Sequence, residues 1–347
     1  MKIAIYKDFK EKSHSTDWGN PWSTYCEQQC IPYDFVDLFK CDPITTLKDY
    51  DVLLWHFGQY RHAEMLEARS ILNAAKKMGL KVFPDFNDAW HFDDKVAEMY
   101  ILQAIGAPIP QSVVYYDKST IKKDIEEGKI HFPIVGKLRT GSGSHNVKLL
   151  KSKHDLLGYA SKMFAGGYNP APSLLYKTSS NIRSSHNKTE FLSKLKRAPE
   201  FLRTLAGAKH FPHEKDYVYL QQFIPNDGYD MKVVVVGDKC AFLVRPVRSH
   251  DFRASGGGEV FFDKKYFKKQ VIESAFKVSD ALGTQCMGYD YVVNKETGEG
   301  MIVEMSYGFS HQAIMASGGY YDKDFNWHAE PLNAPMELLK NILGNGI

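Results

Sequence analysis

The chain has 347 residues, which at the usual domain size corresponds to roughly two or three domains. Lysine and arginine number 44 against 41 aspartates and glutamates, and the net charge of +3 is too small for nucleic-acid binding across the whole chain. Hydrophobic residues make up 44% and aromatic residues 13% of the chain, which is enough to build apolar cores. This composition excludes the disordered, collagen-like and coiled-coil classes.

Targeting and membrane signals are missing from the sequence. The first six residues form a short apolar run followed at once by charged residues, so a signal peptide is not expected. No stretch approaches the roughly 18 consecutive apolar residues of a membrane-spanning helix. The five cysteines are odd in number and scattered, and no second Cys or His pair at zinc spacing accompanies Cys26 and Cys30. We therefore expect a cytoplasmic, reduced protein whose thiols are buried or idle, with metal or redox roles as the alternative.

The first ninety residues alternate between strand-like and helix-like segments. The expected elements are strands at 2–6, 33–38, 51–57 and 80–84 and helices at 21–29 and 63–78. This rhythm predicts a small, mostly parallel α/β domain over residues 1–92. Segment 13–22 joins the first strand to the first helix at the sheet edge where ligands usually bind, although a solvated loop with two tryptophans is an equal interpretation.

A second unit is expected over residues 93–220. Its expected elements are a helix at 95–105 and strands at 133–137 and 147–150. The two strands flank a Gly/Ser-rich tip at 139–145. A basic insertion follows at about 165–215, where nine lysines and arginines face three glutamates between positions 177 and 215. We interpret it either as a solvated surface segment or as a flap that attracts an anionic ligand.

The last third, residues 221–347, is dominated by strand-like segments. A strand expected at 218–223 crosses its start. The other expected elements are strands at 231–236, 241–244, 287–293 and 301–305 and a helix at 266–282. No parallel rhythm connects them, so this part of the chain is expected to be α+β.

Common catalytic motifs are missing. The sequence holds no P-loop or dinucleotide-binding glycine pattern, and no nucleophile-elbow, zincin or kinase catalytic-loop pattern. The candidate chemistry must therefore come from residues on neighbouring strands and loops.

Two acidic residues, Asp290 and Glu304, lie in the adjacent strands of the last expected hairpin. By strand alternation one face of the second strand carries Glu304 and Ser306, and the other carries Met301, Val303 and Met305. Two carboxylates in adjacent buried strands repel each other and lose hydration, so they need a cation, and Mg²⁺ is the suitable hard ion. Because edge strands often carry acids, a purely structural role is the alternative.

Basic residues accompany this hairpin along the chain. Lys137 closes an apolar strand directly before the Gly/Ser-rich tip, a place where an ammonium and backbone N–H groups cradle phosphate oxygens. Asp230 and Lys232 alternate onto one face of a strand. Three arginines follow within positions 245–253, a density that fits an oxyanion or phosphate clamp better than a packed core.

The order of these motifs resembles the ATP-grasp superfamily, in particular its carboxylate–amine ligase branch with the RimK-like glutamate ligases. The resemblance extends from about Asp93 to Phe309. The motifs are Asp-Lys at 94–95, Pro-Ile-Val-Gly-Lys at 133–137, Thr-Gly-Ser-Gly-Ser at 140–144, Gln-Gln-Phe-Ile at 221–224, Asp-Met-Lys at 230–232, Asp-Phe-Arg-Ala-Ser at 251–255, Gly-Tyr-Asp at 288–290 and Val-Glu-Met-Ser at 303–306. It implies an ATP-grasp fold, α/β and α+β, behind an N-terminal parallel α/β domain.

The resemblance implies that residues from several of these motifs bind ATP. Lys95 and Lys137 would hold its phosphates, and the glycine-rich loop would close over them. The other candidates are Gly141, Ser142, Gly143 and Ser144 in that loop, Gln221, Gln222, Phe223 and Ile224 around the adenine, and Asp230 near the ribose.

The resemblance further implies a metal site and a catalytic set. Asp290 and Glu304 would bind Mg²⁺, or Mn²⁺ in its place. Ser306 stands where an asparagine normally completes the metal site, which leaves the number of ions open. The catalytic candidates are Arg245, Arg253 and Lys232. The two arginines would face the transferred phosphate and the acceptor carboxylate, and the lysine replaces a usual arginine and loses its planar fork.

The implied activity is that of an ATP-dependent ligase that joins a carboxylate to an amine through an acyl phosphate. The carboxylate would belong to an amino acid, a peptide or a sugar acid, and an anionic acceptor would suit the basic insertion. An ATP-grasp kinase or phosphotransferase is one alternative, and a nucleotide-binding module without turnover is another. The expected partners are small molecules, without nucleic acid or a membrane span, and a homo-oligomer is left open.

Overall fold

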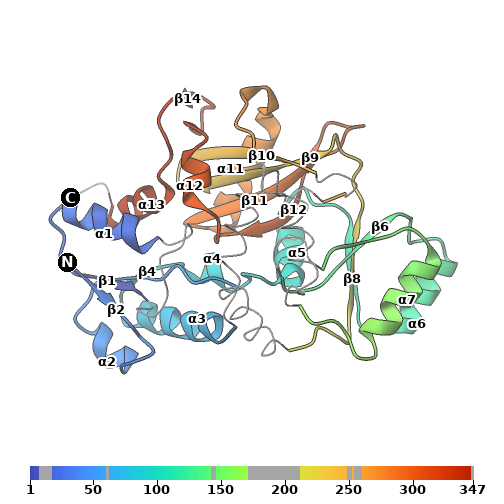
Figure 1. The fold of residues 1–347 in the computed structure, drawn as a ribbon, viewed down its shortest axis with the longest axis horizontal. Coiled ribbons are helices and arrows are strands. Elements are labelled where there is room, and N and C mark those ends of the chain that lie inside the picture. Colours follow the sequence, from blue (N-terminus) through green and yellow to red (C-terminus); the bar gives the residue numbers. More distant parts are fainter. Residues whose placement is uncertain are drawn as a thin grey trace, which may run out of the picture.

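The computed structural model describes residues 1–7, 18–59, 62–141, 146–170, 212–247, 252–253 and 260–344. The described residues form one parallel and two antiparallel sheets with helices around them (Figure 1). None of the helices in this part of the chain is both long enough and apolar enough to cross a membrane. The mixture of a parallel sheet with antiparallel sheets agrees with the expected fold class.

The N-terminal sheet is parallel, with strand order β2-β1-β3-β4. Its strands are β1 (Ile3–Tyr6), β2 (Tyr33–Val36), β3 (Val52–Leu54) and β4 (Lys81–Phe83), and its helices are α1 (Gly19–Gln28), α2 (Pro43–Leu47), α3 (His62–Lys77) and α4 (Phe86–Ala89). The four strands and the two longer helices occupy the segments that the βαβ rhythm predicts. Gly79, with a φ of +99°, follows the end of α3, where a left-handed residue commonly closes a helix.

A four-stranded antiparallel sheet with order β5-β8-β6-β7 forms what we call the middle lobe. Its elements are β5 (Ser112–Tyr115), β6 (Ile134–Lys137), β7 (Lys148–Leu150), β8 (Val218–Gln222), α6 (Lys118–Glu126) and α7 (Lys153–Met163). The preceding helix α5 (Lys95–Ala104) begins at Asp94, whose side chain caps it. The sequence predicts β6, β7, β8 and α5, whereas the short β5 and the helices α6 and α7 give too little periodic signal.

The third sheet has six antiparallel strands in the order β12-β11-β9-β10-β13-β14. Its elements are β9 (Tyr229–Val236), β10 (Lys239–Pro246), β11 (Cys286–Val293), β12 (Gly300–Ser306), β13 (Tyr320–Tyr321) and β14 (Trp327–His328), with α11 (Lys269–Leu282), α12 (His311–Met315) and α13 (Ala334–Leu343). The first four strands and α11 confirm the predicted segments. α11 begins later than predicted because residues Lys264–Tyr266 form a separate 3₁₀ turn.

The alternation predicted for β12 is wrong on the N-terminal side of Val303. Asp290 pairs with Glu304, but the next pair joins Tyr291 to Ile302, so Val303 is an extra residue in β12. This bulge leaves Val303 and Glu304 lining the same cavity. The three apolar residues expected on one face of β12 therefore do not share it.

One apolar core joins the N-terminal sheet to the six-stranded sheet, whereas the middle lobe has a core of its own. We call the two sheets that share a core, with their helices, the body. In Figure 1 the blue N-terminal part and the orange to red C-terminal part lie beside each other, with the green middle lobe at one end. Helix α5 packs on both sides, because Val96 and Met99 join the middle core and Leu102 joins that of the body.

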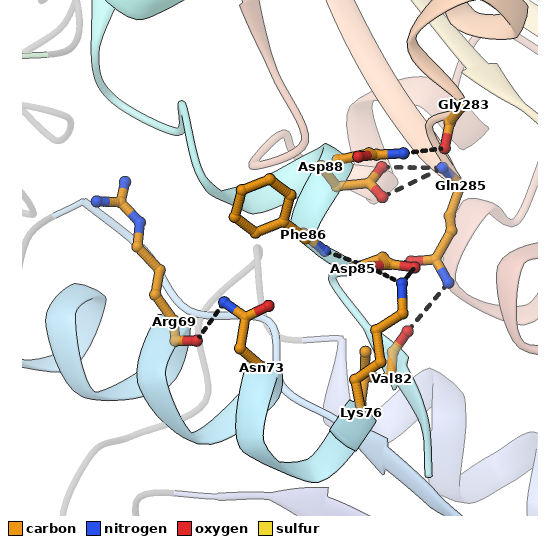
Figure 2. Close-up of polar contacts among 10 residues, drawn as sticks. Arg69, Asn73, Lys76, Val82, Asp85, Phe86, Asp88, Gly283 and Gln285 are labelled. Atoms are coloured by element: carbon orange, nitrogen blue, oxygen red, sulfur yellow. Dashed lines mark hydrogen bonds and ion pairs between the residues drawn. The ribbon is translucent and has the colours of Figure 1, made fainter. Parts of the chain in front are cut away.

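Hydrogen bonds also hold β4 and α4 to the segment at the start of β11 (Figure 2). The Asp88 carboxylate accepts from the backbone N–H of Gln285 at 3.0 Å. It also accepts from the backbone N–H of Cys286 at 3.1 Å. The Gln285 side chain donates to the Val82 carbonyl at 3.0 Å and accepts from the Asp85 N–H at 3.0 Å. Burial raises the pKa of Asp88 to about 7. Directional contacts therefore add to the apolar packing within the body.

Candidate nucleotide and metal site

A cavity between the middle lobe and the six-stranded sheet brings most of the predicted site residues together. The predicted residues that line it are Lys137, Gln221, Gln222, Phe223, Ile224, Asp230, Arg253, Asp290 and Glu304. Its apolar lining comes from Val135, Val147, Val292, Val303 and other side chains. Residues from β6, β8, β9, β11 and β12 thus meet at one place in the fold.

A row of charged residues runs across neighbouring strands of the six-stranded sheet, and three of them, Asp230, Asp290 and Glu304, line the cavity. Glu304 of β12 pairs with Asp290 of β11, which pairs with Lys232 of β9, so the three side chains leave the same face of the sheet. Asp230 lies two residues before Lys232 on this face and pairs with Arg245 of β10. The antiparallel hairpin therefore places the two predicted metal ligands directly opposite each other.

Lys232 and Arg245 both hold the Asp290 carboxylate. Lys232 Nζ lies 2.6 Å from Asp290 Oδ1, and Arg245 Nη2 lies 2.8 Å from Asp290 Oδ2. Arg245 also donates from Nε and Nη2 to the two oxygens of Asp230, at 2.7 and 2.8 Å. Burial opposes the charge on Asp290, but the two cations outweigh it and hold its pKa well below the usual range. For Asp230 burial prevails over Arg245 and raises the pKa to about 6.

Lys137, at the end of β6, lies across the cavity in the middle lobe. Its Nζ donates to the Val303 carbonyl at 2.8 Å, and the residue is 6% exposed. Burial lowers the pKa of Lys137 to about 8. An anion in the cavity would favour the charged ammonium and raise this pKa again.

Lys95 begins helix α5, directly after its Asp94 cap. Lys95 Nζ donates to the Gly141 carbonyl at 2.7 Å and lies 3.4 Å from Glu304 Oε1. Burial disfavours the ammonium, but the carboxylates of Glu304 and Asp93 outweigh it and raise the Lys95 pKa. Because Gly141 begins the glycine-rich loop, Lys95 connects that loop to the predicted metal ligand.

Two further acids beside Lys95 were not among the predicted site residues. Glu98, one turn along α5, is 3% exposed, and its Oε2 accepts from the Met305 N–H at 3.2 Å. Asp93 Oδ1 accepts from the Gly141 N–H at 2.9 Å. Burial raises the pKa of Glu98 to about 8 and that of Asp93 to about 6. The only signal for Glu98 is an acid three positions after Lys95, and most such helix acids are solvated.

The base of the glycine-rich loop is anchored on both sides. Gly141 has a φ of +112°, a conformation that favours glycine. Thr140 Oγ1 donates to Glu214 Oε1 at 2.7 Å, and beyond the loop Asn146 Nδ2 donates to the Pro170 carbonyl at 3.0 Å. The predicted loop residues that lie outside the described ranges are Ser142, Gly143 and Ser144.

The end of β8 forms the side of the cavity predicted to contact adenine. Gln221 is 4% exposed, and its Nε2 donates to Ser112 Oγ and to the Tyr219 hydroxyl, each at 3.2 Å. Phe223 packs edge to face against Phe252, with the ring centroids 6.3 Å apart. The predicted segments that lie outside the described residues are most of the basic insertion (171–211), residues 13–17 of the first loop, 248–251 and 254–259.

The oxygen donors of β11 and β12 fit a hard divalent cation. Lys95 is the only hydrogen-bond or ion-pair partner of Glu304 among the described residues, and Asp290 lies directly opposite Glu304. Ser306 Oγ accepts from the Gly308 N–H at 3.0 Å. The described residues include no group of three or more His, Cys, Asp or Glu that could hold a metal. Two carboxylates of this kind suit Mg²⁺ or Mn²⁺ bound together with phosphate oxygens rather than in an all-protein cage.

Solved structures of similar fold support the resemblance drawn from the motifs. The RimK-domain ATP-grasp protein from Sphaerobacter thermophilus DSM 20745 matches with a TM-score of 0.56 at 15% identity, over 99% of this chain and 100% of that one. The D-alanine–D-alanine ligase from Bacillus anthracis, solved with ATP, matches with a TM-score of 0.55 at 16% identity, over 90% of this chain and 88% of that one. D-cycloserine synthetase DcsG matches with a TM-score of 0.56 at 12% identity, over 99% and 98%. The chain therefore has the ATP-grasp fold.

No protein-family profile matches the chain, and no curated protein matches it by sequence.

Proposed function

We propose that the chain is an ATP-dependent ligase that joins a carboxylate to an amine through an acyl phosphate. The observation that carries this proposal is that Lys137, Asp290 and Glu304 line one cavity, while the buried Lys95 lies beside it with its Nζ 3.4 Å from Glu304 Oε1. Buried cations facing metal-binding oxygens suit a triphosphate that is to be cleaved. Two of the proteins of similar fold are a ligase and a synthetase by name.

In the proposed complex ATP occupies the cavity between the middle lobe and the six-stranded sheet. Its adenine lies against the segment from Gln221 to Ile224, with Asp230 beside the ribose. Lys95 and Lys137 hold the phosphates, and the loop that begins at Gly141 covers them. Lys137 then exchanges the Val303 carbonyl for a phosphate oxygen, which is a stronger, charge-assisted contact.

Asp290 and Glu304 would hold Mg²⁺, or Mn²⁺ in its place. The ion would withdraw negative charge from the phosphate oxygens during transfer. Arg245 and Lys232 keep Asp290 ionised and fixed in position, because both are bonded to its carboxylate.

The proposed reaction has two steps. A carboxylate is a poor acylating agent, because its leaving group would be oxide. One of its oxygens therefore attacks the γ-phosphorus of ATP; the bond to the bridging β-phosphate oxygen breaks and ADP leaves, while Lys95 and Lys137 neutralise the charge on the transferred group. The amine nitrogen then attacks the acyl carbon, phosphate leaves with the carboxylate oxygen, and the nitrogen loses a proton to solvent. Arg253, which lines the cavity, would stabilise the oxyanion of this second step.

The class of substrate is inferred from the amino-acid sequence, in particular from the basic insertion. The carboxylate would belong to an amino acid, a peptide or a sugar acid, and the basic insertion would attract an anionic acceptor. A panel of such carboxylates, each combined with a panel of amino acids and other amines, should reveal the pair that gives steady ADP release.

Hydroxylamine trapping tests the proposed intermediate. Wild-type protein with ATP and the accepted carboxylate should yield a hydroxamate before any amine is added, because hydroxylamine attacks acyl phosphates. If phosphate is transferred to a hydroxyl acceptor and no hydroxamate forms, the protein is a kinase and not a ligase. If the protein binds nucleotide but turns over no pair of substrates in the panel, it is a nucleotide-binding module without catalytic activity.

A further inference from the structure

The number of cations that this site accommodates can be argued from the partners of its oxygen atoms. Both oxygens of Asp290 are already in contact with cations of the chain: Oδ1 lies 2.6 Å from Lys232 Nζ and Oδ2 lies 2.8 Å from Arg245 Nη2. A carboxylate oxygen has two lone pairs, so one further cation can share Asp290 from the side of Glu304. A second cation on Asp290 would have to use a lone pair beside Lys232 or Arg245, and the positive charge of that group would repel it.

The two basic groups differ in how firmly they are held. Arg245 is fixed by three contacts to two carboxylates, those of Asp230 and Asp290. Lys232 has Asp290 as its only ion-pair or hydrogen-bond partner among the described residues, and its side chain is 16% exposed. The ammonium of Lys232 is therefore a compact positive charge, buried beside the predicted metal ligand and directed to it alone.

Ser306 Oγ is the other side-chain oxygen on this face of β12, and it is already hydrogen-bonded within the following turn. Ser306 Oγ accepts from the Gly308 N–H at 3.0 Å and lies 3.4 Å from the Gly308 carbonyl oxygen, so it belongs to the turn that leaves β12. A hydroxyl is also a weaker ligand for a hard cation than a carboxylate. Among the described residues of this charged row, the one other carboxylate is that of Asp230, and Arg245 donates two hydrogen bonds to it.

We propose that the chain binds its nucleotide with a single divalent cation, held by Glu304 and Asp290, and that the ammonium of Lys232 supplies the positive charge beside Asp290 that a second cation would otherwise bring. This inference rests on the proposed nucleotide binding. Paired metal ions in phosphoryl-transfer sites lie about 3.5–4 Å apart and share a carboxylate. An ammonium already 2.6 Å from that carboxylate repels a second ion and carries part of its charge.

Counting bound Mn²⁺ tests the proposal without any turnover. The full chain is held in excess over a non-hydrolysable ATP analogue, Mn²⁺ is added stepwise, and the free ion is measured by electron paramagnetic resonance. We expect one Mn²⁺ per bound nucleotide and the spectrum of an isolated ion. Two ions per nucleotide, or the spectrum of a spin-coupled pair, would overturn the proposal. Failure of the analogue to bind at all would overturn the proposed function, and the inference with it.

Variants of Lys232 test the part played by the ammonium. Lys232→Met removes the charge and keeps the length of the side chain, and Arg245 still holds Asp290. We expect this variant, combined with Ser306→Asn, to bind a second Mn²⁺. Lys232→Arg keeps the charge and should stay at one ion. Lys277→Met, on the exposed face of α11 where its side chain is 73% exposed, is the matched control and should also stay at one ion.

A single ion in the Lys232→Met/Ser306→Asn variant would refute the role of Lys232. If that variant does not fold, the numbers of Mn²⁺ ions bound by the wild type and by Ser306→Asn still test the proposal. With Lys232 intact, Ser306→Asn should remain at one ion, and a second ion there would show that Ser306 alone limits the number.

Discussion

The body and the middle lobe are each well packed, but the contact between them is of a different kind from the contacts within the body. Inside the body, two sheets share one apolar core, and Asp88 and Gln285 add hydrogen bonds that join α4 and β4 to the segment at the start of β11. The middle lobe has a separate core, and it meets the body along the outer edge of β12. The cavity lies at this second contact.

Hydrogen bonds carry much of the contact along β12. The bonds run from the Ile302 N–H to the Pro108 carbonyl at 2.8 Å, from Lys137 Nζ to the Val303 carbonyl at 2.8 Å, and from the Met305 N–H to Glu98 Oε2 at 3.2 Å. They satisfy polar groups that an edge strand would otherwise leave unpaired. Polar contacts of this kind can be exchanged for contacts to a bound ligand, whereas an apolar core cannot. The difference explains why the candidate site lies between the lobe and the body rather than within the body.

The largest effect is expected from breaking the charged row on the body side. Asp290→Asn should lower ADP formation with the accepted carboxylate by at least about 10²–10³, because the change removes a metal ligand and the partner of Lys232 and Arg245. The asparagine has nearly the same shape, so circular dichroism should show an intact fold. Asp280→Asn, at a side chain that is 62% exposed, is the control and should keep full activity. Near-normal turnover by Asp290→Asn would refute the metal assignment.

A second large effect should appear in the stability of the body and depend on pH. The pKa of Asp88 is about 7 in the folded chain, above its ordinary value of 3.8. Between these two values the folded state binds the proton more tightly, so stability falls as the pH rises towards 7, by at most about 1.4 kcal/mol per pH unit. Asp88→Asn resembles the protonated acid and should lose this dependence.

Urea unfolding of both proteins from about pH 5 to pH 8 measures this difference. The stability of the wild type relative to Asp88→Asn should decrease over that range. Nucleotide affinity should be the same in the two proteins at each pH, because Asp88 lies within the body and does not line the cavity. Parallel stability curves would mean that Asp88 is ionised throughout.

Sequence patterns predicted most of the elements that carry the site. The apolar runs of β9, β11 and β12 marked the strands, and the turn between the last two predicted the hairpin that brings Asp290 opposite Glu304. The resemblance to ATP-grasp proteins added Lys95 and the end of β8, which no local pattern marks as functional.

Other features depend on contacts that a linear pattern does not encode. The bulge at Val303 follows from the pairing of β12 with β11, and strict alternation fails there. Glu98 and Asp93 look like ordinary acids near a helix start, and only their burial beside Lys95 marks them as part of the site. The shared core of the body joins segments that are more than a hundred residues apart, so it is visible only in the fold.

A moderate effect is expected from the middle-lobe side of the cavity. Lys137→Met keeps the apolar stem and removes the ammonium, so it should weaken ATP binding by about 1.5–3 kcal/mol, the usual contribution of a charge-assisted hydrogen bond. Adenosine has no phosphate, and its affinity should be nearly unchanged. Isothermal titration with both ligands measures the difference, and Lys123→Met on the exposed side of α6 is the control. Equal losses for ATP and adenosine would show that Lys137 is structural.

The smallest effect concerns Glu98, which belongs to α5 and bonds to the body. Because burial raises its pKa to about 8, Glu98 is mostly protonated at neutral pH, and Glu98→Gln should change ATP affinity there by less than about threefold. Above pH 8 the wild type acquires a negative charge beside Lys95 and Glu304, so its ATP affinity should fall below that of Glu98→Gln. Glu98→Ala removes the acceptor of the Met305 N–H and should cost about 1–3 kcal/mol of stability at any pH. ATP titrations of the wild type and Glu98→Gln on both sides of pH 8 test this assignment. A glutamine variant that already binds ATP much more weakly at pH 7 would show that Glu98 works as a charged carboxylate, and the contact between lobe and body would then contain one more fixed charge.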